Sequence, residues 1–165
     1  GRMQYQFGPV DLSVLVTEVG VELRPGVEKK GLQLEVSVPE EKVMVWGDGG
    51  KLKQVFSNII DNATKYTPKG NISVTLRKMP GTSMAHVEVR DTGIGMSEET
   101  LKRMFIKFTR GDNAQEVNNN GSGLGLFIVK TFVESHHGTI TAASEGVGKG
   151  TQFFVDIPLL VQTTS

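Results

Sequence analysis

The sequence predicts an α/β two-layer sandwich, in which helices cover one face of a mixed β-sheet. Long segments with apolar residues at helical spacing, residues 11–29 and 48–66, are interspersed with short segments in which apolar and polar residues alternate. Two of the short segments, residues 71–79 and 84–91, are separated only by Pro80-Gly81-Thr82-Ser83, which indicates an antiparallel hairpin. Because hairpins are mixed with grouped helices, we expect about five strands covered by three helices.

The individual elements follow from local signals. Asp11 can cap the first helix, and Pro25 near its end is expected to bend it. Glu98 and Glu99 suit the start of a short helix that continues to Phe105. The polar run 111–121 is predicted to be a mobile loop. The other predicted elements are the strands 32–38, 42–46, 138–145 and 150–159 and a helix over 122–136.

Size and composition fit one compact domain. The chain has 165 residues, of which 38% are hydrophobic, and a formal net charge of zero, which argues against nucleic acid as a partner. It has no cysteine, so disulfides and thiolate metal sites are excluded. No apolar run reaches the ~20 residues of a membrane span, and no secretory signal opens the chain. We expect a fragment of a longer protein, with an N-terminal remnant or linker over 1–6, the domain over 7–160 and a disordered tail over 161–165.

Asn58 and Asn62 lie four residues apart in the helix 48–66, on one stripe of its surface. Two amides on one stripe can supply oxygen ligands to a hard cation such as Mg²⁺. Two glycine-rich segments follow, DTGIGM (91–96) and GSGLGL (121–126), whose backbone amides can approach phosphate oxygens. Together they indicate a magnesium–nucleotide site. Each segment alone also fits an ordinary structure: solvent-facing asparagines, or a plain Asp-Xaa-Gly turn.

The second glycine-rich segment excludes two common nucleotide-binding motifs. No strand directly precedes it and its glycines are not spaced as Gly-Xaa-Gly-Xaa-Xaa-Gly, so it is not a dinucleotide fingerprint. It lacks the Gly-Lys-Ser/Thr that ends a phosphate-binding loop of the P-loop type.

Five segments in order carry a family resemblance. They are the asparagine-bearing helix with Asn58 and Asn62, DTGIGM, FIKFTRGD (105–112), GSGLGLFIVK (121–130) and GKGTQFFVDIPL (148–159). This set resembles the catalytic ATP-binding domain of sensor histidine kinases, in the GHKL superfamily of gyrase, mismatch-repair ATPases and heat-shock chaperones. The resemblance runs from about Phe7 to Leu159. It implies a Bergerat-type fold with a flexible ATP lid at about residues 96–121.

The resemblance implies a role for each residue of the helix 48–66 that matches the family pattern. Asn62 binds the Mg²⁺ that bridges the ATP phosphates, and Asn58 supports it. Lys65 contacts phosphate as a flexible point charge. Tyr66 packs beside the adenine, although its position also continues the apolar stripe of the helix and equally fits the core.

In DTGIGM, the resemblance implies that Asp91 accepts a hydrogen bond from the adenine amino group, which selects adenine over guanine. A wrong base leaves a buried acceptor unpaired, at a cost of roughly 1–3 kcal/mol. The glycines Gly93 and Gly95 let the backbone approach the base. The side chains of Ile94 and Met96 line the apolar slot beside it.

The remaining implied contacts lie further along the chain. Arg110 reaches the terminal phosphate, and Phe105 and Phe108 anchor the lid; a solvated Arg110 is the alternative. Thr151 helps hold a water bound to adenine. The catalytic residues are then Asn58, Lys65 and Arg110. The start of the helix after the second glycine box faces the phosphates through Gly121, Ser122, Gly123, Leu124, Gly125 and Leu126.

The function implied by the resemblance is donation of the ATP γ-phosphate to a histidine on a separate dimerisation domain, followed by a response regulator. None of the three histidines, His86, His136 and His137, has the sequence context of a phosphoacceptor, and the latter two end a helix, where a cation suits the dipole. We expect a cytoplasmic domain, monomeric alone, from a homodimeric parent that can be anchored in the inner membrane. Three alternatives stay open: a GHKL ATPase, disfavoured because Asn58 replaces its usual glutamate, a serine kinase, and a nucleotide-binding module without chemistry.

Overall fold

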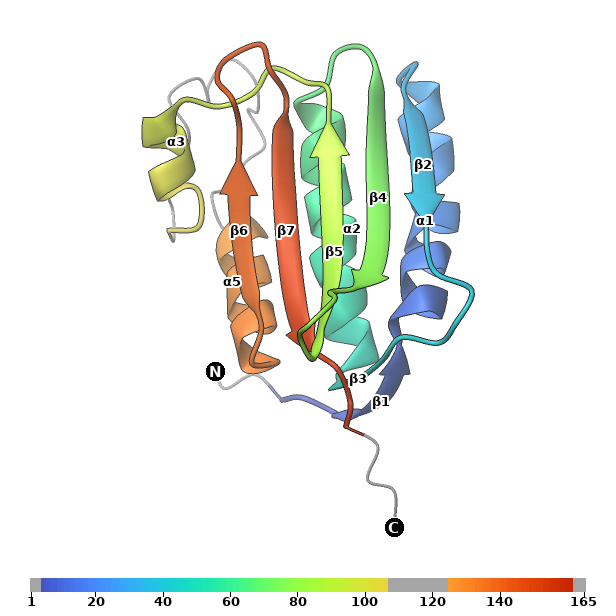
Figure 1. The fold of residues 1–165 in the computed structure, drawn as a ribbon. Helices are drawn as coiled ribbons and strands as arrows, with labels where there is room; N and C mark the ends of the chain where they lie inside the picture. Colours follow the sequence, from blue (N-terminus) through green and yellow to red (C-terminus); the bar gives the residue numbers. More distant parts are fainter. Residues whose placement is uncertain (1–3, 107–124, 162–165) are drawn as a thin grey trace.

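A computed structural model describes residues 4–106 and 125–161 (Figure 1). The main sheet has five strands in the order β2-β4-β5-β7-β6. In chain order the elements are β1 (Gly8–Asp11), α1 (Leu12–Lys29), β2 (Gln33–Ser37), β3 (Met44–Gly47), α2 (Gly49–Lys65), β4 (Asn71–Lys78), β5 (Met84–Asp91), α3 (Glu98–Arg103), α5 (Gly125–Ser135), β6 (Thr139–Ala143) and β7 (Thr151–Pro158).

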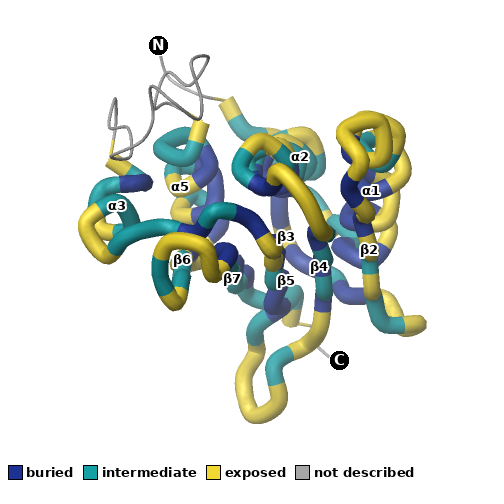
Figure 2. Tube along the Cα trace, turned by 90° about the horizontal axis from the view of Figure 1, so that it is seen from above, coloured by how far each residue is buried: buried dark blue, intermediate teal, exposed yellow. Residues whose placement is uncertain are grey.

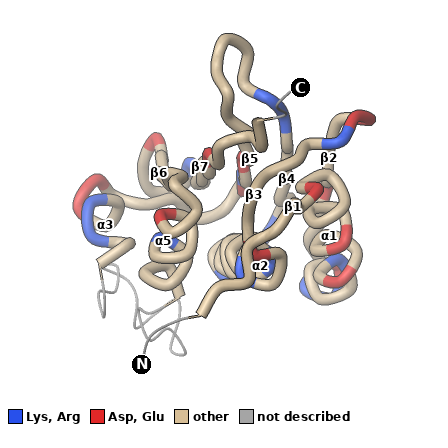
Figure 3. The backbone as a smooth tube through the Cα atoms, turned by 90° about the horizontal axis from the view of Figure 1, so that it is seen from below, with Lys and Arg blue, Asp and Glu red and all other residues tan. Residues whose placement is uncertain are grey.

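The predicted two-layer sandwich is confirmed. Helices α1, α2 and α5 lie side by side against one face of the sheet, and no helix in the described part of the chain covers the other face (Figures 1 and 2). The sheet is mixed because β2 runs parallel to β4, whereas the β4–β5, β5–β7 and β7–β6 pairs are antiparallel. Basic and acidic residues both occur on α1, α2 and α3 (Figure 3).

One predicted strand lies outside the main sheet. Residues 44–47 pair antiparallel with β1 in a separate two-stranded sheet, with Pro9 opposite Trp46. The sequence analysis did not predict β1, because four residues that begin Gly8-Pro9 carry no alternating apolar pattern. This small sheet leads the chain from one edge of the sandwich into α2.

Helix α1 begins and ends where the sequence predicts, with Pro25 inside it. Asp11 caps it, since its Oδ1 accepts a hydrogen bond of 2.9 Å from the amide of Ser13. The helix passes through Pro25 to Lys29. A proline removes the hydrogen bond to the carbonyl four residues earlier, here that of Val21. Val21 is on the exposed side of the helix, where water can bond to that carbonyl.

Helix α2 is packed along one stripe, and this packing decides where its polar residues lie. The stripe is part of the same buried core as strand residues such as Ile72, Val89 and Phe153. Burying each large apolar side chain contributes about 1.5–3 kcal/mol, so the rotation of the helix about its axis is strongly fixed. Asn58 and Asn62 flank the stripe and are half-buried. The buried stripe consists of Leu52, Val55, Phe56, Ile59, Ile60 and Ala63.

The start of α2 is anchored by partners that are distant in sequence. Asp48 caps the helix because its Oδ1 accepts a hydrogen bond from the amide of Lys51. Its Oδ2 accepts from the amide of Gln6. Burial alone would raise the pKa of Asp48, but these amides and the Lys51 charge outweigh it and lower the pKa. The buried ring of His136 accepts from the Asp48 amide at Nε2 and lies 2.7 Å from the Phe132 carbonyl at Nδ1. A ring nitrogen that accepts a hydrogen bond carries no proton, so the His136 ring is neutral in this arrangement. The expectation of a cation at this helix end is therefore wrong for His136.

His137 is the only non-glycine residue with a positive φ in the described part of the chain, at 62°. This conformation costs a side-chain-bearing residue roughly 1 kcal/mol, and glycine is the usual occupant just after a helix. His137 is exposed, so His137→Gly loses no packing. Glycine also raises the entropy of the unfolded chain, which offsets part of this gain. The net stabilisation that we expect is roughly 0.5 kcal/mol, or about 1–2 °C in Tm. Thermal unfolding checks this, with His137→Ala as a control that should gain nothing; a lower Tm for the glycine variant contradicts it.

Candidate functional site

Four segments meet at one edge of the sandwich, which Figure 2 shows from above. They are the ends of β5 and α2, the start of β7 and the turn between β6 and β7. Asp91 is paired with Thr151 across β5 and β7. The amide of Ile94 donates to the carbonyl of Tyr66 at 3.0 Å, and the amide of Gly148 donates to the carbonyl of Ile94 at 2.5 Å. The structure therefore brings together the predicted base-contacting residues from three separate parts of the sequence.

Asp91 is buried at this edge, with 6% of its surface exposed. Its Oδ1 accepts from the amide of Gly93 at 2.9 Å and from the amide of Thr151 at 3.2 Å. Burial raises the pKa of Asp91, and these two amides and the Thr67 hydroxyl oppose that rise. Because Oδ1 holds both amides, Oδ2 is the oxygen that remains for a ligand with a hydrogen-bond donor.

The glycines of this edge are required by close backbone approaches. A Cβ on Gly93 would lie 2.1 Å from the carbonyl oxygen of Tyr66. Gly95 has a φ of 70°, and a Cβ there would lie 2.1 Å from the carbonyl oxygen of Gly146. Gly150, at φ 75°, would place a Cβ 2.2 Å from the carbonyl oxygen of Asp91. No side chain fits at these positions, so the loop after β5 can lie directly on α2 and on the β6–β7 turn.

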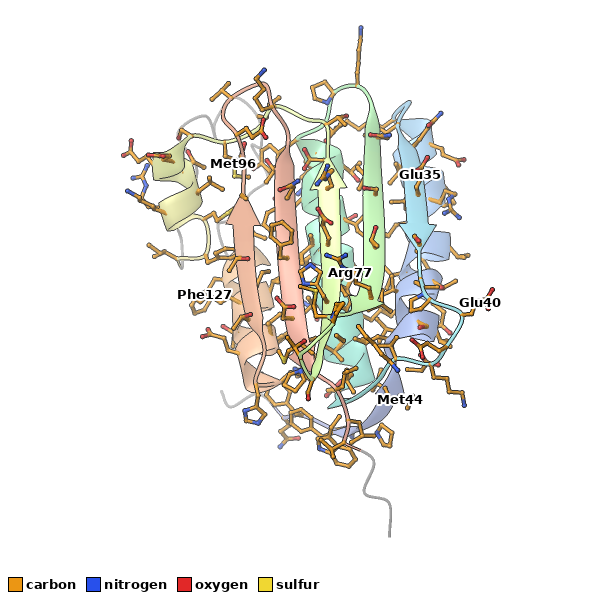
Figure 4. All side chains as sticks on the ribbon, in the orientation of Figure 1. Glu35, Glu40, Met44, Arg77, Met96 and Phe127 are labelled. Carbon is orange, nitrogen blue, oxygen red and sulfur yellow. The ribbon has the colours of Figure 1, made fainter. Side chains whose placement is uncertain are left out.

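Ser144 organises the turn beside this loop, and the sequence analysis missed it. Its hydroxyl oxygen is 2.6 Å from the carbonyl of Gly150 and accepts from the amide of Met96 at 3.1 Å. It thereby joins the β6–β7 turn to Met96, which lies two residues before α3 and is labelled in Figure 4. A serine in a glycine-rich turn is common, and only the fold reveals that its partner lies 48 residues away.

The predicted metal and phosphate ligands, Lys65, Asn62 and Asn58, lie on α2 at increasing distance from the base-contacting edge towards the start of the helix. The backbone carbonyl of Asn62 accepts from the amide of Tyr66, so Asn62 is one turn, about 6 Å, from that edge, and Asn58 is one turn further. Neither asparagine side chain hydrogen-bonds to another described residue, and both are half-buried. The Lys65 side chain is exposed at the same end of the helix.

This donor set fits Mg²⁺ only together with phosphate. Amide oxygens are hard, neutral ligands, and two of them leave a divalent charge uncompensated. Within residues 4–106 and 125–161, no group of three or more His, Cys, Asp or Glu residues could hold a metal ion. Asn58 and Asn62 therefore suit an ion whose charge is balanced by a bound triphosphate.

The end of α2 has a further support that sequence reasoning missed. Lys30, just after α1, donates to the carbonyls of Thr64 and Lys65. A cation at a helix C-terminus stabilises its unpaired carbonyls. Lys30 thus holds in place the helix end that carries Lys65 and Tyr66.

Several predicted site residues lie outside the described part of the chain: Phe108, Arg110, Gly121, Ser122, Gly123 and Leu124. Gly125 begins α5 and is exposed, and Leu126 is half-buried against the core. Before the gap, Ser97 caps α3, and Phe105 packs edge-on to Phe153 with ring centroids 6.3 Å apart. The part of the predicted lid that is described is therefore attached to the core through Phe105.

Comparison with known proteins identifies the family. Residues 47–161 match the family described as histidine kinase-, DNA gyrase B-, and HSP90-like ATPase. The signal transduction histidine-protein kinase BaeS of Escherichia coli (strain K12) is 33% identical over 159 residues, which are 96% of this chain and 33% of BaeS. The chain spans a quarter to a third of the length of the curated relatives it matches. No helix in the described part of the chain is both long and apolar enough to cross a membrane.

Solved structures agree with this family. Full-length ShkA in complex with AMPPNP superposes with a TM-score of 0.82 at 26% identity, over 99% of this chain and 33% of ShkA. The mycobacterial sensor histidine kinase MprB superposes with a TM-score of 0.79 at 26% identity, over 95% of this chain and 100% of that chain. The chain belongs to the histidine kinase-, gyrase B- and HSP90-like ATPases, and within them to the catalytic ATP-binding domains of sensor histidine kinases.

Proposed function

We propose that this domain binds Mg-ATP and delivers its γ-phosphate to a histidine on the dimerisation domain of its parent protein, for onward transfer to a response regulator. The observation that carries the proposal is the arrangement of Asp91. Two backbone amides fix one carboxylate oxygen and leave the other for the amino group of adenine. The AMPPNP bound to the similar protein ShkA supports an adenine nucleotide as the ligand.

The residues of α2 would hold the other end of the nucleotide. Asn62, with Asn58 behind it, would ligate Mg²⁺, and Lys65 would contact phosphate. When bound, Mg²⁺ neutralises charge on the phosphate oxygens. Phosphoryl transfer needs positioning and charge neutralisation more than covalent help from the protein, so neutral amides and a lysine suffice. The predicted contact of Arg110 with the terminal phosphate stays a prediction.

The transfer itself requires a nucleophile from outside the described residues of this chain. A ring nitrogen of the acceptor histidine attacks the γ-phosphorus, a P–N bond forms, the bond from phosphorus to the bridging oxygen breaks, and ADP leaves. Asn58 cannot take a proton as the glutamate of a GHKL hydrolase does, which favours transfer to a partner over hydrolysis.

Labelled ATP tests the proposal. With [γ-³²P]ATP and Mg²⁺, the isolated chain should acquire almost no label. Added dimerisation domain of the parent should acquire label that is stable to base and lost in acid, as a phosphohistidine is. Label on a serine of the partner would point to the serine-kinase alternative. ATP binding without any transfer would point to a module without chemistry.

A further inference from the structure

Thr67, two residues after the end of α2, is fully buried, and its hydroxyl has no hydrogen-bond partner within 3.5 Å among the described residues. An unpaired buried hydroxyl costs free energy relative to an apolar group of the same shape. Valine would fill the same volume without that cost. Core packing alone therefore does not explain a threonine at this position.

The hydroxyl points toward the residues that hold Asp91. A Cβ built on Gly93 would lie 2.7 Å from Thr67 Oγ1, and the amide of Gly93 donates to Asp91 Oδ1. Burial raises the pKa of Asp91, and the Thr67 hydroxyl is among the groups that lower it. The hydroxyl therefore lies on the carboxylate side of the loop, where Asp91 is the group that it can stabilise.

We propose that Thr67 is a positioning residue for Asp91, whose hydroxyl donates to the carboxylate and keeps it ionised and oriented for the adenine amino group. The proposal rests on the assignment of Asp91 to the adenine amino group. The adenine amino group is a hydrogen-bond donor. An ionised carboxylate accepts at both oxygens, whereas a protonated one carries a donor on one of them. A hydroxyl donor beside the carboxylate favours its ionised form.

The groups that shift the pKa of Asp91 carry no charge. Burial raises this pKa, and the amides of Gly93 and Thr151 and the Thr67 hydroxyl lower it. The titratable residues on the elements packed against it are Lys51, Lys53, Asp61 and Lys65 from α2, Tyr66 and Lys69 from the segment after it, His86, Glu88 and Arg90 from β5, Asp156 from β7, and Glu145 and Lys149 from the β6–β7 turn. Arg90 is paired with Glu88 at 3.1 Å.

The direct test is a titration of the Asp91 carboxyl carbon by ¹³C NMR in the ligand-free chain. Thr67→Val should raise the pKa of Asp91 by roughly one unit, because it removes a donor and leaves the carboxylate equally buried. Thr67→Ser keeps the hydroxyl and should titrate like wild type. Thr75→Val, which removes a hydroxyl from β4, is the matched control and should also leave the titration unchanged.

Binding provides the second readout. The affinity of Thr67→Val for ADP should be severalfold lower than that of wild type at neutral pH, and lower still below pH 6. Both proteins are compared at the same pH, so the ionisation of ADP itself affects them equally. The ligand-free variant should remain folded, because valine fills the volume of threonine. Thr67→Ala gives a second variant without the hydroxyl.

The possible results separate this proposal from the one it rests on. An unchanged Asp91 titration in both Thr67→Val and Thr67→Ala overturns the role of Thr67, even if nucleotide binding is normal. Equal affinity of wild type for ADP and GDP overturns the adenine assignment, whatever Thr67 does to the carboxylate.

Discussion

Asp91→Asn should weaken the binding of ATP and ADP by roughly 10- to 100-fold while the domain stays folded. The asparagine oxygen can still accept from the amides of Gly93 and Thr151, so the loop keeps its shape. Its NH₂ group then replaces Oδ2 and faces the adenine amino group, donor against donor. The loss of one buried hydrogen bond, together with the unpaired groups that it leaves, costs about 1–3 kcal/mol. Because about 1.4 kcal/mol corresponds to a tenfold change in Kd, this cost gives the expected loss of affinity. Isothermal titration calorimetry measures it.

The same substitution should not destabilise the ligand-free domain. The pKa of Asp91 is raised in the folded state, so the folded state binds this proton more tightly than the unfolded state does. That stabilisation is present at low pH and is lost as the pH rises through the raised pKa. At neutral pH the buried charge is therefore unfavourable, and a neutral asparagine removes it. The Tm should equal or exceed that of wild type.

Glu88→Gln on the same strand is the matched control, because it also removes one negative charge and lies outside the site. It should bind nucleotides like wild type. Unaltered ADP affinity in Asp91→Asn would contradict the assignment of Oδ2 to the base. A large fall in Tm would instead show that the carboxylate charge holds the loop together.

Asn62→Ala should remove the magnesium-dependent part of nucleotide affinity. Asn62 is half-buried on α2, one turn from the base-contacting edge, and its side chain makes no hydrogen bond within the described chain. Losing one ligand to the ion should weaken Mg-ADP binding by roughly 10–100-fold, the scale seen when a metal site loses a supporting group. Affinity for ADP in EDTA should change by less than about threefold, and phosphotransfer should fall at least in proportion to Mg-ADP affinity.

Gln54→Ala controls for helix effects, since Gln54 is exposed on the same helix two turns away. It should leave both affinities unchanged. If Asn62→Ala weakened ADP equally with magnesium and with EDTA, the side chain would be contacting the nucleotide or the fold rather than the ion.

Elements with local signals could be predicted from the sequence. The cap at Asp11, the hairpin at residues 80–83 and the stripe of α2 each depend on residues within one or two turns of each other. The same stripe placed Asn58 and Asn62 at the boundary between core and solvent, where the structure has them. Asp91 could be located because a strand pattern ends at it and glycines follow directly.

Features that depend on distant partners could not be predicted. His136 reaches the Asp48 amide across 88 residues, and Ser144 reaches Met96 across 48. Lys30 reaches the end of α2 across 34. Each is a common polar residue in an ordinary context, and its role exists only once the fold supplies the partner. The strand β1 was missed for a different reason, since its four residues carry no alternating apolar pattern.

The central claim is that one carboxylate oxygen of Asp91 binds adenine while Asn62 binds the ion at the phosphate end. A crystal structure of the chain with Mg²⁺ and a nonhydrolysable ATP analogue tests it most directly. We expect the adenine amino nitrogen within about 3 Å of Asp91 Oδ2 and the Asn62 amide oxygen about 2.1 Å from the metal. A base bound elsewhere, or an ion without Asn62 among its ligands, would contradict the account.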